Sequence, residues 1–419
     1  MKNSTRMLAL AAAGTLALTA CGGGSGFEEE TDGDGGGASQ PAASAEGPAA
    51  LRMLIGSSGD AETNAVQDAA QAWADETGNT VEVTVASDLN QELAQGFAGG
   101  SPADIFYLDA QSLADNAKAG NLYAYEAENN DDFYESLRSS FTYDGKQWCA
   151  PKDFSTLALI INTSMWEEAG LTDDDVPTTY DELADVAAKL TDGDRPGLVL
   201  GPGIDRAGAF VVGNGGWWLN EDGTEPTANT PEVLAGLQYV QDLMKEGSAK
   251  LSSQVDTGWG GEAFGTEKGA MTVEGNWIKG AVANDYPDLE YQAVEMPEGP
   301  AGPGTLLFTV CWGIAADSPN QAQAVELVNY LTTPEQQLAF AEAFGVMPSR
   351  QSAAEDYKSA FPEDEAFIAG GEYGHGPVNA PAIKPVVDDL NSKLENFAEA
   401  DLQAALEAFD TNAQSVLGQ

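Results

Sequence analysis

The sequence predicts an α/β protein whose parallel sheet is covered by helices on its faces. Between residues 50 and 109, segments with strand character alternate with segments with helical character, and this order is typical of parallel sheets. Hydrophobic residues make up 42% of the 419-residue chain. That proportion allows a large core divided over two or three domains.

Residue spacing in the first hundred positions supports this prediction. Thr80–Val85 alternates between β-branched and other residues, as a strand with one buried face does. Val66, Ala70 and Trp73 recur at helical spacing. We therefore expect strands at 50–55, 80–85 and 104–108, and helices at 61–77 and 89–98.

The remaining elements follow from local signals along the chain. The apolar run Leu157–Ile161 predicts a buried strand, and Thr179 with Glu182 predicts a capping box at a helix start. Glycines and tryptophans at 210–220 predict a loop. We also expect strands at 198–200, 269–273, 291–294 and 306–315, and helices at 163–170, 180–190, 231–245, 320–331, from 334, and at 388–417.

Charge and composition exclude several classes of function. The chain has 67 acidic and 18 basic residues, a net charge of −49, so nucleic acid and anionic lipid surfaces are not expected partners. One histidine and three cysteines are too few for a zinc site or a Ser-His triad of the usual kind. We expect no metal and no cofactor.

The first twenty residues predict a targeting segment. Lys2 and Arg6 precede the short apolar stretch Met7–Ala17, which is too short to span a bilayer. The following Leu18-Thr19-Ala20-Cys21 resembles the lipobox of bacterial lipoproteins. It predicts a signal peptide at 1–20, a lipid on the Cys21 thiol and a flexible acidic tether at 21–49. Ordinary secretion with cleavage elsewhere is the alternative.

The other two cysteines are Cys149 and Cys311. In a protein outside the cytoplasm, an even pair of cysteines is consistent with a disulfide. Two free buried thiols are the alternative that the residues leave open.

Polar residues follow two of the expected parallel strands. Asp60 and Glu62 come after the first strand, and Asp109 and Gln111 come after the third. Ligands of such sheets bind outside the carboxyl ends of the strands, so these side chains are candidate ligand contacts. Each could instead cap the next helix.

Tryptophans are concentrated between residues 210 and 280. The indole of Trp277 follows a strand and the polar stretch Glu274-Gly275-Asn276. Apolar faces of a sugar ring stack on indoles, while its hydroxyls need fixed polar partners, so this stretch suits sugar capture. Trp217 and Trp218 are adjacent, and on a strand one would be buried while the other faced a ligand. A core role for these tryptophans, Trp259 included, is the alternative.

Three stretches resemble the family 1 extracellular solute-binding proteins, the maltose-binding-protein-like receptors of ABC importers. Leu157–Leu171 is similar to their strand-and-helix signature. Gly269–Trp277 resembles their Gly-x-Ala-Ala-Met…Gly-Pro-Trp segment, with Asn276 where proline is common. Leu331–Gln337 resembles their Leu-Thr-x-Pro-Glu-x-Gln stretch. The likeness extends from about residue 50 to the end.

The resemblance implies a two-lobe periplasmic-binding-protein-like fold of type II. Each lobe would hold a mixed sheet flanked by helices, with a hinge of several segments. Lobe one would comprise residues 50–154 and 302–349, and lobe two residues 155–301 and 350–419. Cys149 and Cys311 would then lie on neighbouring strands beside the hinge, which favours the disulfide.

The resemblance also implies a set of cleft contacts and a set of partners. Partners would be a carbohydrate, the transmembrane subunits of an ABC permease and, through Cys21, the outer face of the cell membrane, with the protein itself a monomer. The contacts carried over by position are Asp60, Glu62, Asp109, Gln111, Asp153, Phe154, Asp205, Arg206, Trp217 or Trp218, Trp259, Glu274, Trp277, and Tyr373 or His375.

We interpret the sequence as that of a receptor that binds an oligosaccharide by hinge closure, without catalysis, and delivers it to the permease. From the resemblance alone, α-linked glucose oligomers are the favoured ligands. A receptor for another solute such as a polyamine, a secreted glycoside hydrolase and a structural surface protein are the alternatives. A hydrolase needs two carboxylates on either side of a glycosidic bond, and 67 acidic residues leave that possibility open.

Overall fold

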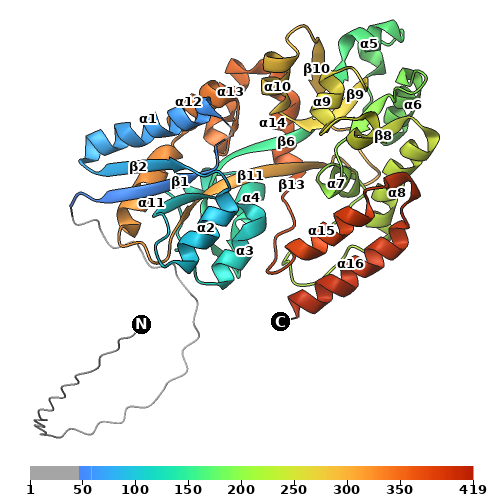
Figure 1. Cartoon of the computed structure of the whole chain (residues 1–419). Coiled ribbons are helices and arrows are strands. Elements are labelled where there is room, and N and C mark those ends of the chain that lie inside the picture. The colour runs from blue at the N-terminus through green and yellow to red at the C-terminus, as the bar shows by residue number, and fades with distance from the viewer. Residues whose placement is uncertain (1–46, 58, 419) are drawn as a thin grey trace, which may run out of the picture. The chain divides into compact units, whose positions relative to one another are not determined.

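A computed structural model describes residues 47–57 and 59–418 (Figure 1). The expected signal peptide, the lipidation site at Cys21 and almost all of the tether lie outside the described residues. Within the described part of the chain, none of the helices is both long enough and apolar enough to cross a membrane.

Three parallel strands form one half of the main sheet. β1 (Ala50–Ile55) pairs with β2 (Thr80–Val85) on one side and with β3 (Ile105–Asp109) on the other. The intervening helices are α1 (Asp60–Thr77) and α2 (Leu89–Ala98), and α3 (Ala110–Lys118) follows β3. The strand and helix pattern predicted for residues 50–109 is therefore confirmed.

Two long strands continue the sheet into its second half. β11 (Thr305–Ile314) runs antiparallel to β3, and β6 (Ala150–Asn162) runs antiparallel to β11. The partner of β6 changes at its middle: Thr156 pairs with Leu307 of β11, and Leu157 pairs with Gly275 of β9 (Met271–Gly275). β7 (Leu198–Leu200) and β8 (Ala249–Leu251) complete the order β2-β1-β3-β11-β6-β9-β7-β8.

Short strands and the remaining helices surround this sheet. β10 (Tyr291–Val294) and β12 (Met347–Pro348) pair with β6, β13 (Gly374–His375) pairs with β11, and β4 (Thr142–Tyr143) pairs with β5 (Lys146–Gln147). The other helices are α4 (Glu135–Ser140), α5 (Thr163–Glu168), α6 (Tyr180–Leu190), α7 (Ile204–Gly213), α8 (Pro231–Glu246), α9 (Gly260–Gly265), α10 (Ile278–Asp285), α11 (Gln321–Leu331), α12 (Pro334–Phe344), α13 (Ala354–Ala360), α14 (Glu365–Tyr373), α15 (Lys384–Lys393) and α16 (Leu402–Leu417).

Three clusters of buried apolar side chains form the core. The first core draws on residues 51–150 and 311–340, and the second on residues 157–296, 306 and 378–413. A third core lies beside β6, because successive side chains of a strand point to opposite faces. Leu157, Leu159 and Ile161 enter the second core, whereas Ala158 and Ile160 enter the third.

The predicted disulfide is present between Cys149 and Cys311. Both cysteines are buried in the first core, and Cys311 lies on β11 opposite Pro151 of β6. The bond therefore joins β11 to the residue immediately before β6.

Two local predictions are wrong for physical reasons. Residues 210–213 belong to α7 rather than to a loop; Gly213 permits close helix packing, since an added Cβ would lie 2.1 Å from the Tyr180 hydroxyl. The helix expected at 388–417 is two helices, and the break is stabilised by Gln241 of α8. The Gln241 amide donates to the carbonyls of Phe397 and Ala400, each at 2.9 Å.

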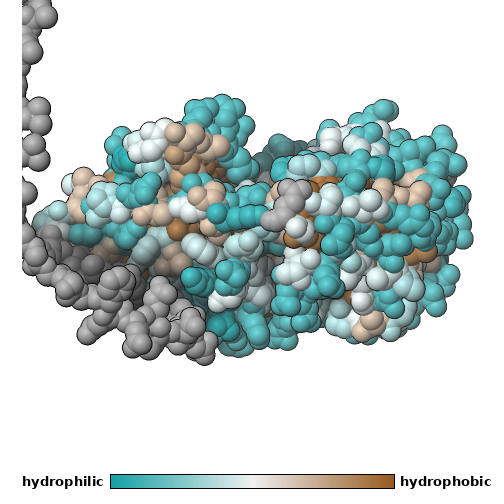
Figure 2. Space-filling view, turned by 90° about the horizontal axis from the view of Figure 1, so that it is seen from below, coloured by the Kyte–Doolittle hydropathy of each residue, from teal (hydrophilic) through white to brown (hydrophobic). Residues whose placement is uncertain are grey.

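The capping box at the start of α6 is confirmed, with Thr179 and Glu182 bonding each other's backbone N–H groups. The described surface is mostly polar: Figure 2 shows hydrophilic residues over most of one face. Among the described residues, Val85 is the large apolar side chain that stands exposed. This surface agrees with the strongly acidic composition.

Candidate functional site

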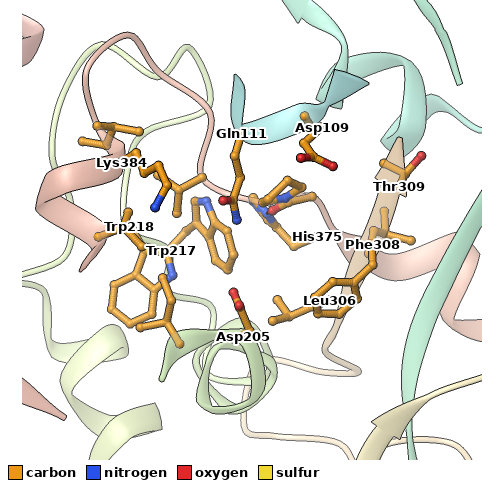
Figure 3. A pocket seen from close by; sticks show the side chains of 18 of the residues that line it. Asp109, Gln111, Asp205, Trp217, Trp218, Leu306, Phe308, Thr309, His375 and Lys384 are labelled. Carbon is orange, nitrogen blue, oxygen red and sulfur yellow. The ribbon is translucent and has the colours of Figure 1, made fainter. Parts of the chain in front are cut away.

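A cavity of about 410 Å³ opens where both halves of the sheet meet (Figure 3). Its walls come from the start of α3, from β11, from α7 and the loop that follows it, and from the segment that leads from β13 into α15. These elements supply Asp109, Gln111, Asp205, Trp217, Trp218, the run Leu306–Val310, and residues from His375 to Asn391.

Hydrogen-bond acceptors dominate the polar part of this lining. Asp109, at the end of β3, accepts a 3.4 Å hydrogen bond from the Asn90 amide, and Asp205 lies in the first turn of α7. Lys384 brings a positive charge to the rim, but its ammonium bonds both carboxylate oxygens of Asp388 at 2.9 Å. The cavity therefore offers carboxylates and the Gln111 amide to a ligand, with little free positive charge from the lining residues.

The adjacent tryptophans lie outside any strand and differ in burial, and both line the cavity. Trp218 is fully buried and packs near Phe409, with ring centroids 6.1 Å apart. Trp217 is half-buried and lines the cavity. The imidazole of His375 stacks on Trp217, with ring centroids 3.8 Å apart and an angle of 32° between the planes.

A buried ion pair lies behind the Phe308 side of the cavity. Arg206 Nη2 is 2.7 Å from Glu274 Oε2, and the indole N–H of Trp277 donates to the same oxygen at 3.0 Å. The Arg206 guanidinium also lies 5.4 Å from the Trp277 ring centroid and 5.6 Å from that of Phe308. These residues brace the wall of the cavity, because Phe308 packs edge-on against Trp277.

A second buried charge cluster involves two residues of β6, Lys152 and Asp153. Lys152 forms ion pairs with Glu62 (3.0 Å) and with Asp153, and Tyr107 donates to Glu62 at 3.0 Å. Burial acts to lower the pKa of Lys152, but the two carboxylates outweigh it and hold that pKa above its ordinary value. Glu62 and Asp153 are therefore engaged with the protein itself.

Four other predicted contacts also lie outside the cavity lining. Asp60 is exposed at the start of α1, and Phe154 is buried in the third core. Trp259 packs against the third core just before α9, and the Tyr373 hydroxyl donates to Glu295 at 3.0 Å. The structure thus gathers Asp109, Gln111, Asp205, Trp217 and Trp218 in one cavity, and it places Arg206, Glu274 and Trp277 behind its wall.

Sequence reasoning missed part of the lining. The strand now seen as β11 was expected, yet no local signal shows that Leu306–Val310 lies at the centre of the sheet beside the cavity. Lys384 was missed because α15 begins four residues before the predicted helix start. Asn391 lies within the predicted helix, where no local signal points to the cavity. Among the described residues, no three or more histidine, cysteine, aspartate or glutamate side chains are arranged to hold a metal ion.

Comparison with known proteins gives the family. Residues 68–369 match the profile of the family described as "Bacterial extracellular solute-binding protein". The chain belongs to this family. The resemblance drawn from the three sequence stretches is thereby confirmed, and membership places the solute-binding protein on the extracellular side.

Two of the curated relatives of this solute-binding protein have names that state a saccharide ligand. The diacetylchitobiose binding protein DasA of Streptomyces coelicolor is 25% identical over 315 residues, covering 72% of this chain and 73% of the relative. A galactooligosaccharide-binding protein of Bacillus subtilis is 23% identical over 379 residues, covering 85% and 87%.

Solved structures confirm the two-lobe fold. An ABC substrate-binding protein of Listeria monocytogenes in complex with cycloalternan matches with a TM-score of 0.77 at 20% identity, covering 88% of this chain and 99% of that one. A cyclic α-maltosyl-1,6-maltose binding protein of Arthrobacter globiformis also matches with a TM-score of 0.77, at 23% identity and the same coverage.

Proposed function

We propose that this solute-binding protein is the receptor of an ABC importer and that it binds an oligosaccharide in the cavity described above. The observation that carries the proposal is the placement of the Trp217 indole in one cavity with Asp109, Gln111 and Asp205. An indole offers a flat apolar surface to the CH groups of a sugar ring, while carboxylates and an amide match its hydroxyls. The names of the two curated relatives support a carbohydrate as the ligand class.

The polar groups would provide selectivity. Asp109 is partly buried and Asp205 is exposed in this structure, and the proposed lobe closure would bury them against the ligand. A carboxylate then left without a hydrogen-bond partner costs free energy, so the closed cavity would disfavour ligands whose hydroxyls do not match it. The ion pairs of Lys384 and Arg206 leave little positive charge for an anionic ligand. An uncharged saccharide fits this lining better than a phosphorylated compound does.

The preferred sugar is proposed to be an α-linked glucose oligomer. Support comes from solved structures of the same fold in complex with cycloalternan and with maltotetraose. The curated relatives name diacetylchitobiose and galactooligosaccharide instead, so these sugars belong in the same test panel.

The lobes are proposed to comprise residues 50–154 with 302–349, and 155–301 with 350–419. The three crossings would lie on β6, before β11 and near Arg350. Arg350 supports the last crossing, since its guanidinium donates to the carbonyls of Asn129 and Glu128 at 2.9 and 2.8 Å. Closure of the lobes would bury the sugar and present the closed form to the permease.

Membrane attachment through a lipid on Cys21 completes the proposal. Replacing Cys21 by alanine should release the protein from the membrane fraction of expressing cells into the medium. If the variant stays in the membrane fraction, the lipid anchor is not at this cysteine.

The ligand class is tested by intrinsic fluorescence and thermal-shift titration with a panel of malto-, isomalto-, chito- and galacto-oligosaccharides and spermidine. We expect a saccharide to bind, and Trp217→Ala to weaken it by about tenfold or more. Trp148→Phe is the matched control, because Trp148 packs against the first core away from the cavity lining. If no saccharide changes either signal, the ligand class is wrong; release of reducing sugar would instead favour a hydrolase.

A further inference from the structure

The imidazole of His375 occupies the indole surface that a sugar would use. His375 is the single histidine in the sequence. Its ring lies 3.8 Å from that of Trp217, centroid to centroid, with the planes 32° apart. Both residues line the cavity (Figure 3). The platform assigned to the ligand is therefore covered by the protein's own side chain.

Another part of the Trp217 indole packs against the protein. It contacts the second core, and near α7 a Cβ added at Gly208 would lie 3.8 Å from its six-membered ring. A sugar ring consequently has no access to the His375 side of Trp217 while the imidazole stays in place. Stacking on that side requires His375 to move.

The bonds that hold the His375 side chain are few. Its backbone is fixed, because β13 pairs with β11 and places His375 opposite Leu306. The residue is exposed overall, although the imidazole loses part of its hydration against the Trp217 ring, and Nδ1–H donates to the carbonyl of the next residue, Gly376, at 2.8 Å. Rotation of the ring into solvent would give up this local bond and the stacking contact, and would leave the strand pairing intact.

We propose that His375 is a displaceable cover of the Trp217 platform, and that a saccharide binds by pushing the imidazole off the indole. The inference rests on the proposed function, since it takes Trp217 as the stacking surface. The cover lowers the affinity of every saccharide that stacks on Trp217, because binding must offset the stacking contact and the hydrogen bond that His375 gives up. It also keeps the indole from exposing apolar surface when no ligand is bound.

The alternative role for His375 is a direct contact that strengthens binding, and the two roles predict opposite effects of truncation. For a cover, His375→Ala tightens saccharide binding by about two- to tenfold, the worth of an aromatic pair. His375→Phe is the matched control, because it keeps a flat ring over Trp217 and should bring no such gain. In a His375→Ala/Trp217→Ala double variant the gain should disappear, because no platform remains to be uncovered.

The experiment is isothermal titration of the intact protein and its variants with the saccharide that binds best in the panel. Thermal unfolding confirms that each variant is folded. Equal or weaker binding by His375→Ala would overturn the cover while leaving the proposed function in place. Absence of saccharide binding in the unsubstituted protein and in His375→Ala alike would reject the proposed function itself.

Proton NMR supplies a second measurement that does not depend on substitution. The single imidazole gives one Hε1 signal, which the indole ring current should shift upfield in the free protein. Saturation with saccharide should move this signal towards the position of an unstacked histidine. A signal that stays upfield in the complex would contradict the cover, because the imidazole would then still lie on the indole.

Discussion

Replacing Glu274 by alanine tests whether the buried ion pair behind the cavity holds its wall in place. The Glu274 side chain is 0% exposed, and one of its oxygens receives bonds from Arg206 at 2.7 Å and from the Trp277 indole at 3.0 Å. Truncation would leave the Arg206 guanidinium, whose side chain is 14% exposed, without a carboxylate partner. Removing one member of a buried ion pair costs about 3–5 kcal/mol.

The structure favours the lower end of that range. Arg206 keeps a 2.9 Å bond to the Asp205 carbonyl and its contacts with the rings of Trp277 and Phe308, so its charge would not be wholly unsatisfied. We expect Glu274→Ala to lower the free energy of unfolding by about 3 kcal/mol. Glu274→Gln keeps an acceptor for the indole N–H and should cost about 1–3 kcal/mol.

Urea unfolding of Glu274→Ala, Arg206→Met and the double variant measures these values. The double variant should lose less free energy of unfolding than the two single variants lose together, by about 1–3 kcal/mol, because the two side chains stabilise each other. Saccharide titration of the same proteins shows whether loss of the pair also loosens the site. A loss below about 1 kcal/mol in Glu274→Ala, or additive losses, would refute the view that this pair stabilises the wall.

Three further predictions concern the disulfide, the segment beside the cavity and pH. Replacing Cys149 and Cys311 by serine opens a link across 162 residues and should lower the free energy of unfolding by about 3–5 kcal/mol in urea; a loss under about 1 kcal/mol would contradict this. Asn379→Ala removes hydrogen bonds to the Ala114 N–H (3.3 Å) and the Ser140 carbonyl (3.2 Å). This change should lower the free energy of unfolding by about 1–2 kcal/mol and speed amide exchange over residues 374–383. Unchanged exchange would show that these bonds do not hold the segment. In the covered state, desolvation lowers the pKa of His375 from its ordinary value of 6.5, and the hydrogen bond to Gly376 acts in the opposite direction. The covered state therefore binds a proton less readily than the uncovered state does. Protonation of His375 consequently favours the uncovered state. Saccharide affinity should therefore rise as pH falls from 7.5 through about 6.5. Asp109, Asp205 and Asp388 face the same cavity with Lys384. An equal rise in the affinity of His375→Phe would assign the pH dependence to those carboxylates.

Much of the fold could be predicted because its signals are local. The alternation in Thr80–Val85, the helical spacing from Val66 to Trp73 and the capping box at Thr179 each depend on residues a few positions apart. The break between α15 and α16 could not be predicted in this way. It depends on Gln241, 156 residues before the Phe397 carbonyl that it bonds, and no periodicity in the helix itself reports that contact.

The candidate site was predictable only in part, for the same reason. Asp109 and Gln111 reach the cavity because polar residues after a parallel strand gather at its carboxyl end. Glu62 follows a parallel strand too, yet it is paired with Lys152 of β6, a partner that its sequence neighbours do not reveal. Likewise, the sequence places Trp217 and His375 158 positions apart; the pairing of β13 with β11 fixes the backbone of His375, whose ring then meets that of Trp217.

β11 is the element that turns these separate stretches into one site. Its Val310 pairs with Asp109 of β3, and its Leu306 pairs with His375 of β13. Between them, Phe308 packs against Trp277, which shares Glu274 with Arg206. The run Leu306–Val310 lines the cavity along its length. Because β11 contacts the residues that carry Asp109, His375 and the Trp277 side of the ion pair, we expect the proposed lobe closure to change the ligand contacts if it shifts this strand relative to β3 or β6.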